Sequence, residues 1–300
     1  MRPEKEQFAT LEGVSLCYET FGDESRPALL LVMGLGTQMI GWHADFCSRL
    51  AERGFFVVRY DNRDVGRSTH LDHRPPPTTR EILTRRHRQP AYTLGDMAED
   101  GVRLLDRLGI DAAHVVGASM GGMLAQLMAA WWPERVRSLV SIMSNTGSLR
   151  SGQPALRLYP SFLARPPRSK EEYVDRLVKV FGIIGSSGFE RDEGDLRLLA
   201  ETAFDRGADP AGSGRQLAAI QSSGSRVRDL RRIKAPTLVI HGTADLLVRP
   251  SGGRATARAI PNARLQLIDG MGHDLPRGAW PQIIDGIVGN AAAASPLVAA

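Results

Sequence analysis

The chain has 300 residues, with 38 Lys and Arg against 33 Asp and Glu, two cysteines and a hydrophobic fraction of 42%. A chain of this length buries about three quarters of its unfolded surface, so one large or two small domains need no disulfide or metal for stability. Cys17 and Cys47 match no disulfide framework and no metal spacing, and no apolar run approaches the roughly 18 residues of a membrane span. These features exclude disulfide-rich, fibrous and membrane-spanning classes.

The excess of basic over acidic residues gives a net charge of +5. The basic residues are scattered along the chain, apart from a cluster of arginines between residues 80 and 88. We interpret this cluster as a solvated surface loop or short helix. The alternative is an entrance that attracts an anionic substrate group or a membrane surface. Few aromatic residues lie among the arginines, so we expect no nucleic-acid partner. The charged N-terminus lacks the apolar core of a secretory signal, which predicts a cytoplasmic location.

Short, continuous apolar runs recur along the chain and alternate with stretches of helical periodicity. The runs occupy residues 28–33, 55–60, 113–116, 136–143, 237–240 and 265–268, after one or two shorter strands within 8–20. Helical spacing of apolar residues characterises 42–53, 93–108 and 121–131. Continuous apolar runs are typical of strands buried on both faces. The alternation therefore predicts an α/β fold with a mostly parallel sheet and helices on both faces.

The alternation of strands and helices stops near residue 146 and returns near residue 235. The intervening segment contains amphipathic stretches at 171–181 and 195–204 but no convincing strand. We therefore predict an α/β core formed by residues 1–145 and 229–300, with residues 146–228 inserted as a helical cap. Glycine-containing stretches at 182–188 and 207–214 are candidate hinges for motion of this cap.

A G-x-S-x-G motif at residues 117–121 joins a predicted buried strand to a predicted buried helix. Gly117 and Gly121 permit a sharp strand-to-helix turn that exposes the hydroxyl group of Ser119 near the helix N-terminus. A serine with an ordinary pKa is a weak nucleophile and needs a general base. We predict that Ser119 is the nucleophile of a hydrolytic site.

Two later loops supply a base and an acid for this serine. His273 lies in a glycine-flanked loop after the last apolar run, and Asp245 lies in the loop after the preceding run. His241 is the rival base, but it directly follows a strand at the point where the loop of the acid begins. Asp269 is the rival acid, but it is close to His273 in the sequence. We assign His273 as the base and Asp245 as the group that orients and stabilises its imidazolium form.

An oxyanion formed at this serine needs backbone N–H donors. The first donor is expected from Met120, directly after the nucleophile, and the second from Leu35, in the glycine-rich loop after the first long apolar run. Gly34, Gly117 and Gly121 are the expected glycines of the supporting turns. Only the two amides have a chemical role here, so the side chains of Met120 and Leu35 need none.

Together these segments resemble the α/β-hydrolase superfamily, and within it the capped serine esterases and lipases that include aclacinomycin methylesterase and lipase- and thioesterase-like hydrolases of actinobacteria. The matching segments lie at 31–36, 60–68, 115–122, 236–240 and 270–273, and the order serine, aspartate, histidine is that of the superfamily. The resemblance implies eight strands, with the second antiparallel, and a helical cap over the catalytic edge. We expect Asp61, Arg63 and Asp64 to form a hydrogen-bonded network beneath the site.

The residues and the resemblance predict a serine hydrolase that cleaves a carboxylic ester, with thioesters and lactones as related substrates, through an acyl-enzyme on Ser119. No metal or organic cofactor is required. A small apolar or aromatic ester is the expected substrate, because the predicted cap contains apolar residues such as Phe181, Phe189 and Phe204. The same catalytic residues also suit a carbon–carbon hydrolase, an enol-lactonase or a cofactor-free haloperoxidase, and a non-catalytic ligand-binding protein is a further alternative. A monomer and a homodimer are both compatible with the sequence.

Overall fold

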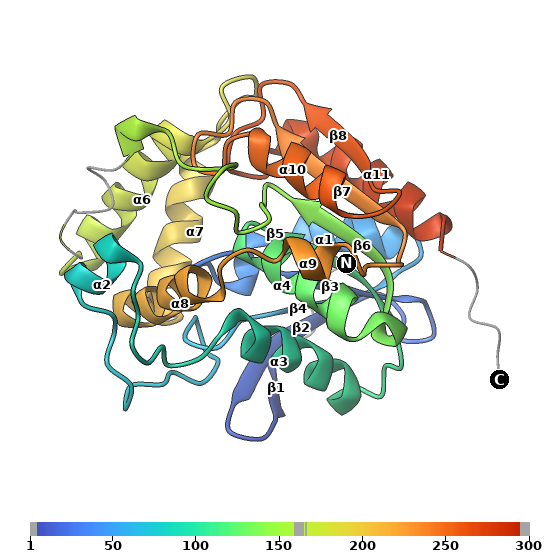
Figure 1. The fold of residues 1–300 in the computed structure, drawn as a ribbon, viewed down its shortest axis with the longest axis horizontal. Coiled ribbons are helices and arrows are strands. Elements are labelled where there is room, and N and C mark those ends of the chain that lie inside the picture. Colours follow the sequence, from blue (N-terminus) through green and yellow to red (C-terminus); the bar gives the residue numbers. More distant parts are fainter. Residues whose placement is uncertain (1–4, 159–164, 166, 295–300) are drawn as a thin grey trace.

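The computed structural model describes residues 5–158, 165 and 167–294. Within these ranges eight strands form one sheet in the order β1-β2-β4-β3-β5-β6-β7-β8 (Figure 1). Strand β2 pairs antiparallel with β1 and β4, and the other neighbouring pairs are parallel. The predicted eight-stranded, mostly parallel sheet with an antiparallel second strand is confirmed. The strands are β1 (Gln7–Thr10), β2 (Ser15–Phe21), β3 (Ala28–Val32), β4 (Phe56–Tyr60), β5 (Ala113–Ala118), β6 (Val136–Ile142), β7 (Thr237–Gly242) and β8 (Arg264–Ile268).

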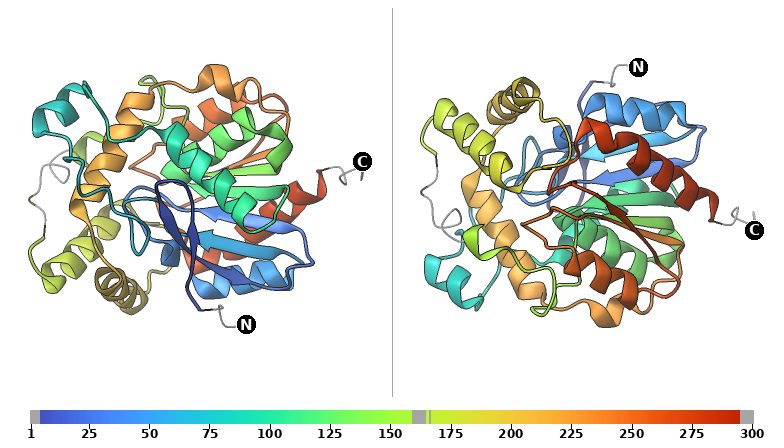
Figure 2. Two further views of the ribbon diagram at one scale, coloured as in Figure 1. Left: turned by 90° about the horizontal axis from the view of Figure 1, so that it is seen from below. Right: turned by 90° about the horizontal axis from the view of Figure 1, so that it is seen from above.

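Helices cover both faces of the sheet (Figure 2). Helices α3 (Leu94–Arg107), α4 (Met120–Trp131) and α10 (Ser251–Ala259) pack on one face, and α1 (Ala44–Glu52) and α11 (Trp280–Ala292) pack on the other. In β3, Leu30 and Val32 join the core beside α4, whereas Leu29 and Leu31 join the core beside α1. Because side chains alternate between the faces and both faces are covered, β3 is apolar at every position.

The remaining α-helices gather at one end of the sheet, on the left of Figure 1 and of both views in Figure 2. They are α2 (Thr79–Thr84), α6 (Lys170–Ile184), α7 (Glu193–Asp205) and α8 (Pro210–Ser223), and the short α9 (Val227–Leu230) leads back towards β7. Between β6 and β7, the described residues form helices and turns but no strand. Helices α6 and α7 contain the two helical stretches predicted there. Single turns of 3-10 helix are η1 (Met39–Gly41), η2 (Pro133–Arg135), η3 (Leu156–Leu158) and η4 (Arg277–Ala279).

Helices α8 and α11 are not predicted by the apolar pattern, although both carry a start signal. Each has a proline in its first turn, and the Asp209 side chain caps α8 by accepting from the amide of Ala211. Gly212 and Gly214 lie inside α8, whereas Gly207 precedes it, so only the first part of the candidate hinge at 207–214 lies outside the helix, and its motion stays a prediction. A Cβ on Gly212 would lie 2.4 Å from the carbonyl oxygen of Asp64. This glycine therefore permits close packing of α8 on the core.

The strand-to-helix turn after β5 brings three backbone segments into direct contact. A Cβ on Gly121 would lie 2.0 Å from the carbonyl oxygen of Val32, and a Cβ on Gly117 would lie 2.1 Å from the carbonyl oxygen of Gly121. No side chain larger than hydrogen fits at either glycine. The first turn of α4 consequently packs directly on the end of β3.

We expect Gly121→Ala to lower the free energy of unfolding by at least about 3 kcal/mol, because the added methyl group would force α4 and β3 apart. The matched control is Gly289→Ala, which lies on the exposed side of α11 with no atom within 4 Å of the added Cβ. This control should be neutral or stabilising, since alanine favours helix. Urea unfolding of both variants measures the difference, and equal stability of the two would contradict the packing argument.

Candidate active site

Ser119 occupies the turn between β5 and α4 with a strained backbone. Its φ is 56° and its ψ is −119°, a combination that residues other than glycine rarely adopt. The amide of Ser119 donates to the carbonyl of Ile142 at 2.9 Å, and α4 begins at the next residue. This is the geometry of a nucleophile elbow, in which a sharp turn exposes a hydroxyl group at the end of a strand.

The structure brings Ser119, His273 and Asp245 together. His273 Nε2 lies 3.0 Å from Ser119 Oγ, and His273 Nδ1 lies 2.8 Å from Asp245 Oδ2. His273 is 8% exposed and Asp245 is 1% exposed, so their contact is shielded from water. The arrangement allows a proton to pass from Oγ to Nε2 while the Nδ1–H group remains bonded to the carboxylate.

Asp245 is buried but strongly stabilised as a carboxylate. Its Oδ1 accepts from the amides of Leu247 and Val248 at 2.9 Å and 2.8 Å, and its Oδ2 lies 3.4 Å from Nε2 of His241. Burial alone would raise the pKa of Asp245, but His273 and His241 outweigh burial and lower this pKa to about 2. The group is therefore ionised at neutral pH and can stabilise an imidazolium on His273.

The two rival residues make other contacts. His241 is fully buried, and its Nε2 donates to the carbonyl oxygen of Val248 at 2.6 Å, which places the ring beside Asp245 and not against Ser119. Asp269 is exposed and accepts from Thr243 Oγ1 at 2.9 Å. The loop geometry thus favours His273 over His241 and Asp245 over Asp269. It also shows His241 as a neighbour of the acid, a role that its sequence position does not reveal.

The glycine-rich loop after β3 lies directly against the serine. A Cβ on Gly34 would lie 3.1 Å from Ser119 Cβ and 3.6 Å from Ser119 Oγ. The amide of Thr37 donates to the carbonyl of Gly34 at 3.2 Å, which closes a turn over residues 34–37. Among the described residues, the amides of Leu35 and Met120 find no protein acceptor. Both N–H groups are free to bind a developing oxyanion.

The end of α6 and the residues that follow it hold the loop that carries His273. The amide of His273 donates to the carbonyl of Ile184 at 2.7 Å, and the amide of Gly272 donates to Ser186 Oγ at 2.8 Å. Gly272 and Ser186 are 86 positions apart in the chain, so no local pattern could identify this contact. The candidate hinge at 182–188 therefore includes residues that position the imidazole.

The polar loop after β4 is buried beneath the site and is extensively bonded. Arg215 donates to both carboxylate oxygens of Asp64 at 2.8 Å, and Arg63 donates to both oxygens of Asp100 at 2.6 Å and 2.7 Å. Burial alone would raise the pKa of Asp64, but bonds from Arg215 and other donors lower it. Buried charges persist only when they are paired and hydrogen-bonded. Together with the bond from Arg206 to Asp61 at 2.9 Å, these contacts form the network expected for Asp61, Arg63 and Asp64.

Two buried ion pairs join this loop to the segment between β6 and β7. Arg206, which follows α7, donates to Asp61 at 2.9 Å, and Arg215 in α8 donates to Asp64 at 2.8 Å. The four side chains are at most 6% exposed. Both pairs connect residues that are more than 140 positions apart, at separations of 145 and 151. Helices α7 and α8 are thereby anchored on the core.

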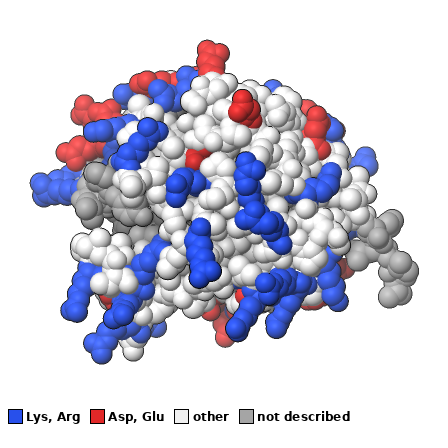
Figure 3. All heavy atoms as spheres, turned by 45° about the horizontal axis from the view of Figure 1, so that its top comes forward, with Lys and Arg blue, Asp and Glu red and all other residues white. Residues whose placement is uncertain are grey.

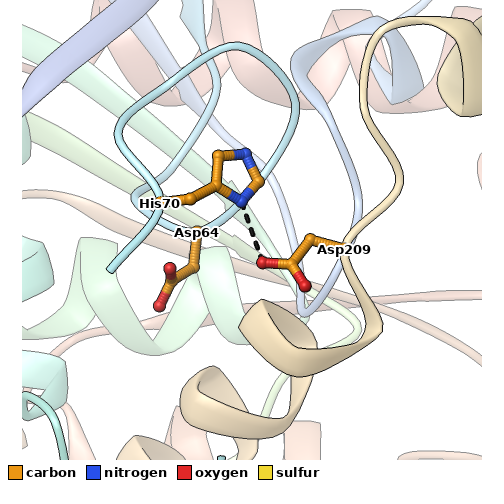
Figure 4. A group of neighbouring side chains, drawn as sticks. All are labelled: Asp64, His70 and Asp209. Carbon is orange, nitrogen blue, oxygen red and sulfur yellow. Dashed lines mark hydrogen bonds and ion pairs between the residues drawn. The ribbon is translucent and has the colours of Figure 1, made fainter. Parts of the chain in front are cut away.

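Asp64, His70 and Asp209 form the group of described residues whose spacing suits a metal ion (Figure 4). The carboxylate oxygens of Asp64 and Asp209 already have cationic partners. Arg215 donates to Asp64 at 2.8 Å and to Asp209 at 3.1 Å, and His70 Nδ1 lies 2.8 Å from Asp209. Because the guanidinium supplies the positive charge that a metal would bring, we assign this cluster to the ion-pair network between the core and α8.

His70 has an acceptor at each ring nitrogen. Nδ1 faces the carboxylate of Asp209, and Nε2 lies 3.0 Å from the carbonyl oxygen of Gly66. Both acceptors lack hydrogen, so this arrangement favours the imidazolium form, in which both ring nitrogens donate. Burial alone would lower the pKa of His70, but the bonds to Asp209 and Gly66, with the nearby charge of Asp64, raise it above its ordinary 6.5. Protonated His70 therefore ties the loop after β4 to the start of α8.

We expect the stabilising effect of His70 to depend on pH. Because its pKa is raised on folding, the stabilisation is complete below about 6.5 and is lost as the pH rises through the folded-state pKa. The difference in unfolding free energy between wild type and His70→Gln should therefore be largest at pH 6 and should shrink towards pH 9. His73→Gln, at an exposed histidine in the same loop, is the control and should show no such trend. A constant difference for His70→Gln would contradict the assignment.

Basic side chains are spread over the face shown in Figure 3 and are separated by uncharged residues. The arginine cluster at 80–88 begins within α2, a short helix with a capping box formed by Thr78 and Glu81, and continues beyond its end. This helix packs against α8. In the part of the chain that the structure describes, no helix has both the length and the apolar character needed to cross a membrane.

Comparison with known proteins identifies the class. The model of the α/β hydrolase fold family matches residues 27–276, so the chain belongs to this family. Rhodomycin D methylesterase DauP of Streptomyces sp. (strain C5) is 29% identical over 307 aligned positions, which cover 95% of this chain and 98% of that protein. Rhodomycin D methylesterase DnrP of Streptomyces peucetius is 28% identical with the same coverage. The 3-oxoadipate enol-lactonase 2 of Acinetobacter baylyi is 26% identical over 87% of each chain.

Solved structures show the same fold. A hydrolase from Pseudomonas aeruginosa PA01 superposes with a TM-score of 0.71 at 26% identity, covering 97% of this chain and 99% of that chain. The enol-lactonase from Burkholderia xenovorans LB400 superposes with a TM-score of 0.75 at 24% identity, covering 95% of this chain and 100% of that chain. The resemblance to the α/β-hydrolase superfamily is confirmed.

Proposed function

We propose that this protein is a carboxylic ester hydrolase that acts through an acyl-enzyme on Ser119. The observation that carries this proposal is the chain of contacts from Ser119 Oγ to His273, at 3.0 Å, and from His273 to Asp245, at 2.8 Å. Two relatives that match almost the whole chain are named as methylesterases, which supports an ester as the substrate.

In the first half of the reaction, Ser119 Oγ attacks the ester carbonyl carbon while His273 Nε2 takes the hydroxyl proton. The carbonyl oxygen becomes an oxyanion, which accepts from the amides of Leu35 and Met120. Asp245 stabilises the positive charge that forms on His273. The C–O bond to the alcohol then breaks, and His273 returns the proton to the departing alkoxide oxygen.

In the second half, water repeats these steps on the acyl-enzyme. His273 takes a proton from the water as its oxygen attacks the acyl carbon, and the same two amides bind the second oxyanion. Collapse of this intermediate breaks the bond to Ser119 Oγ, which recovers its proton from His273. The products are a carboxylic acid and an alcohol, and the free enzyme is regenerated without a metal or an organic cofactor.

Our finer proposal is a methyl ester of a small apolar or aromatic molecule. The names of the two Streptomyces relatives support the methyl group. Residues 146–228 would act as the cap over the substrate, since α6 and α8 contact the loops of His273 and Leu35. In that cap Phe204 packs on Tyr173, so this ring belongs to the interior of the cap itself. The cytoplasmic location and the monomeric or dimeric state remain predictions.

An enol-lactonase is the second candidate. It is supported by the relative from Acinetobacter baylyi, which is 26% identical over 87% of each chain. Both reactions use the same acyl-enzyme, so the active-site residues do not separate them. A panel of aryl and alkyl methyl esters, thioesters and enol-lactones, compared by kcat/KM, distinguishes the two. A lactone preference of tenfold or more would overturn the methyl ester proposal.

Ser119→Ala should lower kcat for a p-nitrophenyl ester by at least about a thousandfold, because the acyl-enzyme can no longer form. The wild type should also bind one equivalent of a fluorophosphonate, and the variant none. Ser25→Ala, in an exposed turn, is the control and should match the wild type in both assays. Substantial turnover by Ser119→Ala would refute the assignment of the nucleophile. If the wild type cleaved no acyl substrate and bound no fluorophosphonate, a non-catalytic ligand-binding protein would be favoured instead.

Asp245→Asn should lower kcat by about 10³- to 10⁴-fold, since the neutral amide no longer stabilises the imidazolium or selects its tautomer. Asp269→Asn, at the exposed rival acid, should keep kcat within about twofold of the wild type. Steady-state kinetics on one ester compare the two substitutions directly. A larger loss in Asp269→Asn than in Asp245→Asn would exchange the roles of the two aspartates.

A further inference from the structure

Gln216, in the middle of α8, connects the candidate oxyanion loop to the loop beneath the site. Its Oε1 accepts from the amide of Gly36 at 2.8 Å, and its Nε2 donates to the carbonyl of Arg63 at 2.8 Å. The side chain is fully buried. An amide N–H can only donate and a carbonyl can only accept, so these partners determine the orientation of the Gln216 amide.

Other segments hold the residues on either side of this turn, since Asn62 Nδ2 donates to the carbonyl of Met33 at 3.0 Å and Gln38 Nε2 donates to the carbonyl of Ala203 at 2.6 Å. Among the described residues, the Leu35–Gly36 peptide itself is bonded by Thr37 Oγ1 at its carbonyl and by Gln216 at its N–H group. The Leu35 side chain is 36% exposed, so its packing does not hold the turn in place. Gly36 has a φ of 62°, and a Cβ there would lie 2.6 Å from Ser213 Oγ, which shows how closely α8 packs on the turn. A trans peptide unit is planar, so a bond to the Gly36 amide also restrains the carbonyl group and the Cα of Leu35, to which the Leu35 amide nitrogen is attached.

We propose that Gln216 is a positioning residue for the oxyanion-binding amide of Leu35. This inference rests on the proposed function. Gln216 holds the Leu35–Gly36 peptide from the side of α8, while the bond from Thr37 to Gly34 closes the turn from within. The Leu35 amide is thereby kept beside Ser119 in advance of the reaction. Substrate binding does not require this restraint, but the negatively charged tetrahedral intermediate does.

The expected signature is a loss in kcat with little change in KM. In Gln216→Leu the Gly36 amide loses its acceptor, so the turn gains freedom and the Leu35 amide is aimed less well at the oxyanion. We expect kcat to fall by about tenfold or more and KM to change by less than about threefold. A trifluoromethyl ketone analogue of the substrate, which Ser119 converts reversibly into a tetrahedral oxyanion adduct, should lose affinity by the same factor as kcat/KM.

The matched control is Gln221→Leu, on the same helix. Gln221 donates to the carbonyl of Ile82 at 3.3 Å and contacts His87 at 2.7 Å, so it also joins α8 to another segment but does not touch the oxyanion loop. It should keep kcat and trifluoromethyl ketone affinity within about twofold of the wild type. Thermal unfolding of both variants tests their fold, and Gln216→Met, whose flexible side chain fills the same space, replaces Gln216→Leu if the latter does not fold.

Three results would overturn the proposal. The first is an unchanged kcat in folded Gln216→Leu or Gln216→Met, and the second is an equal fall in Gln221→Leu. The third is a loss confined to KM, which would indicate a role in substrate binding. Each of these leaves the proposed function intact because the wild type is active. Absence of both turnover and fluorophosphonate labelling in the wild type would instead contradict the proposed function and remove the basis for a role of Gln216.

Discussion

The backbone of α4 packs on the backbone of β3 with no side chain between them. This contact requires hydrogen as the side chain of Gly121, where a Cβ would lie 2.0 Å from the carbonyl oxygen of Val32. It forces the chain to turn sharply at Ser119, with a φ of 56°, and it places Gly34 against the serine. The nucleophile and the loop of Leu35 are therefore neighbours because two backbones meet, and the candidate oxyanion site follows from the same contact.

The helices between β6 and β7 contribute residues that contact the loops of the candidate site. Ion pairs of Arg206 with Asp61 and of Arg215 with Asp64 anchor α7 and α8 in a buried, low-dielectric region where unpaired charges would be strongly destabilising. The end of α6 holds the loop of His273 through the carbonyl of Ile184. A large displacement of the helices between β6 and β7 would break their contacts with the loop of His273 and with the loop of Leu35, which lie on either side of Ser119. The anchoring accordingly favours small adjustments of these helices over the opening of a free lid.

Much of the fold and of the candidate triad was predictable because the evidence is local. Buried parallel strands give near-continuous apolar runs, and the strand–helix order follows from those runs. Ser119 is identified by its flanking glycines, and Asp245 and His273 each follow a strand that ends at the same edge of the sheet. Helix α8 was missed because its glycines suggest a hinge, although Asp209 and a first-turn proline signal its start.

The sequence by itself determined the class of fold, the turn at Ser119 and the identity of the residues that meet there, because glycine sterics and apolar periodicity act over a few residues. Tertiary structure alone decided which other groups bond to Asp245 and to the loops of His273 and Leu35. His241 beside Asp245, Ser186 on the loop of His273 and Gln216 on the loop of Leu35 are polar residues in unremarkable local contexts. Gln216 is 180 positions from Gly36, and only packing of the whole chain brings an acceptor to an amide over that separation.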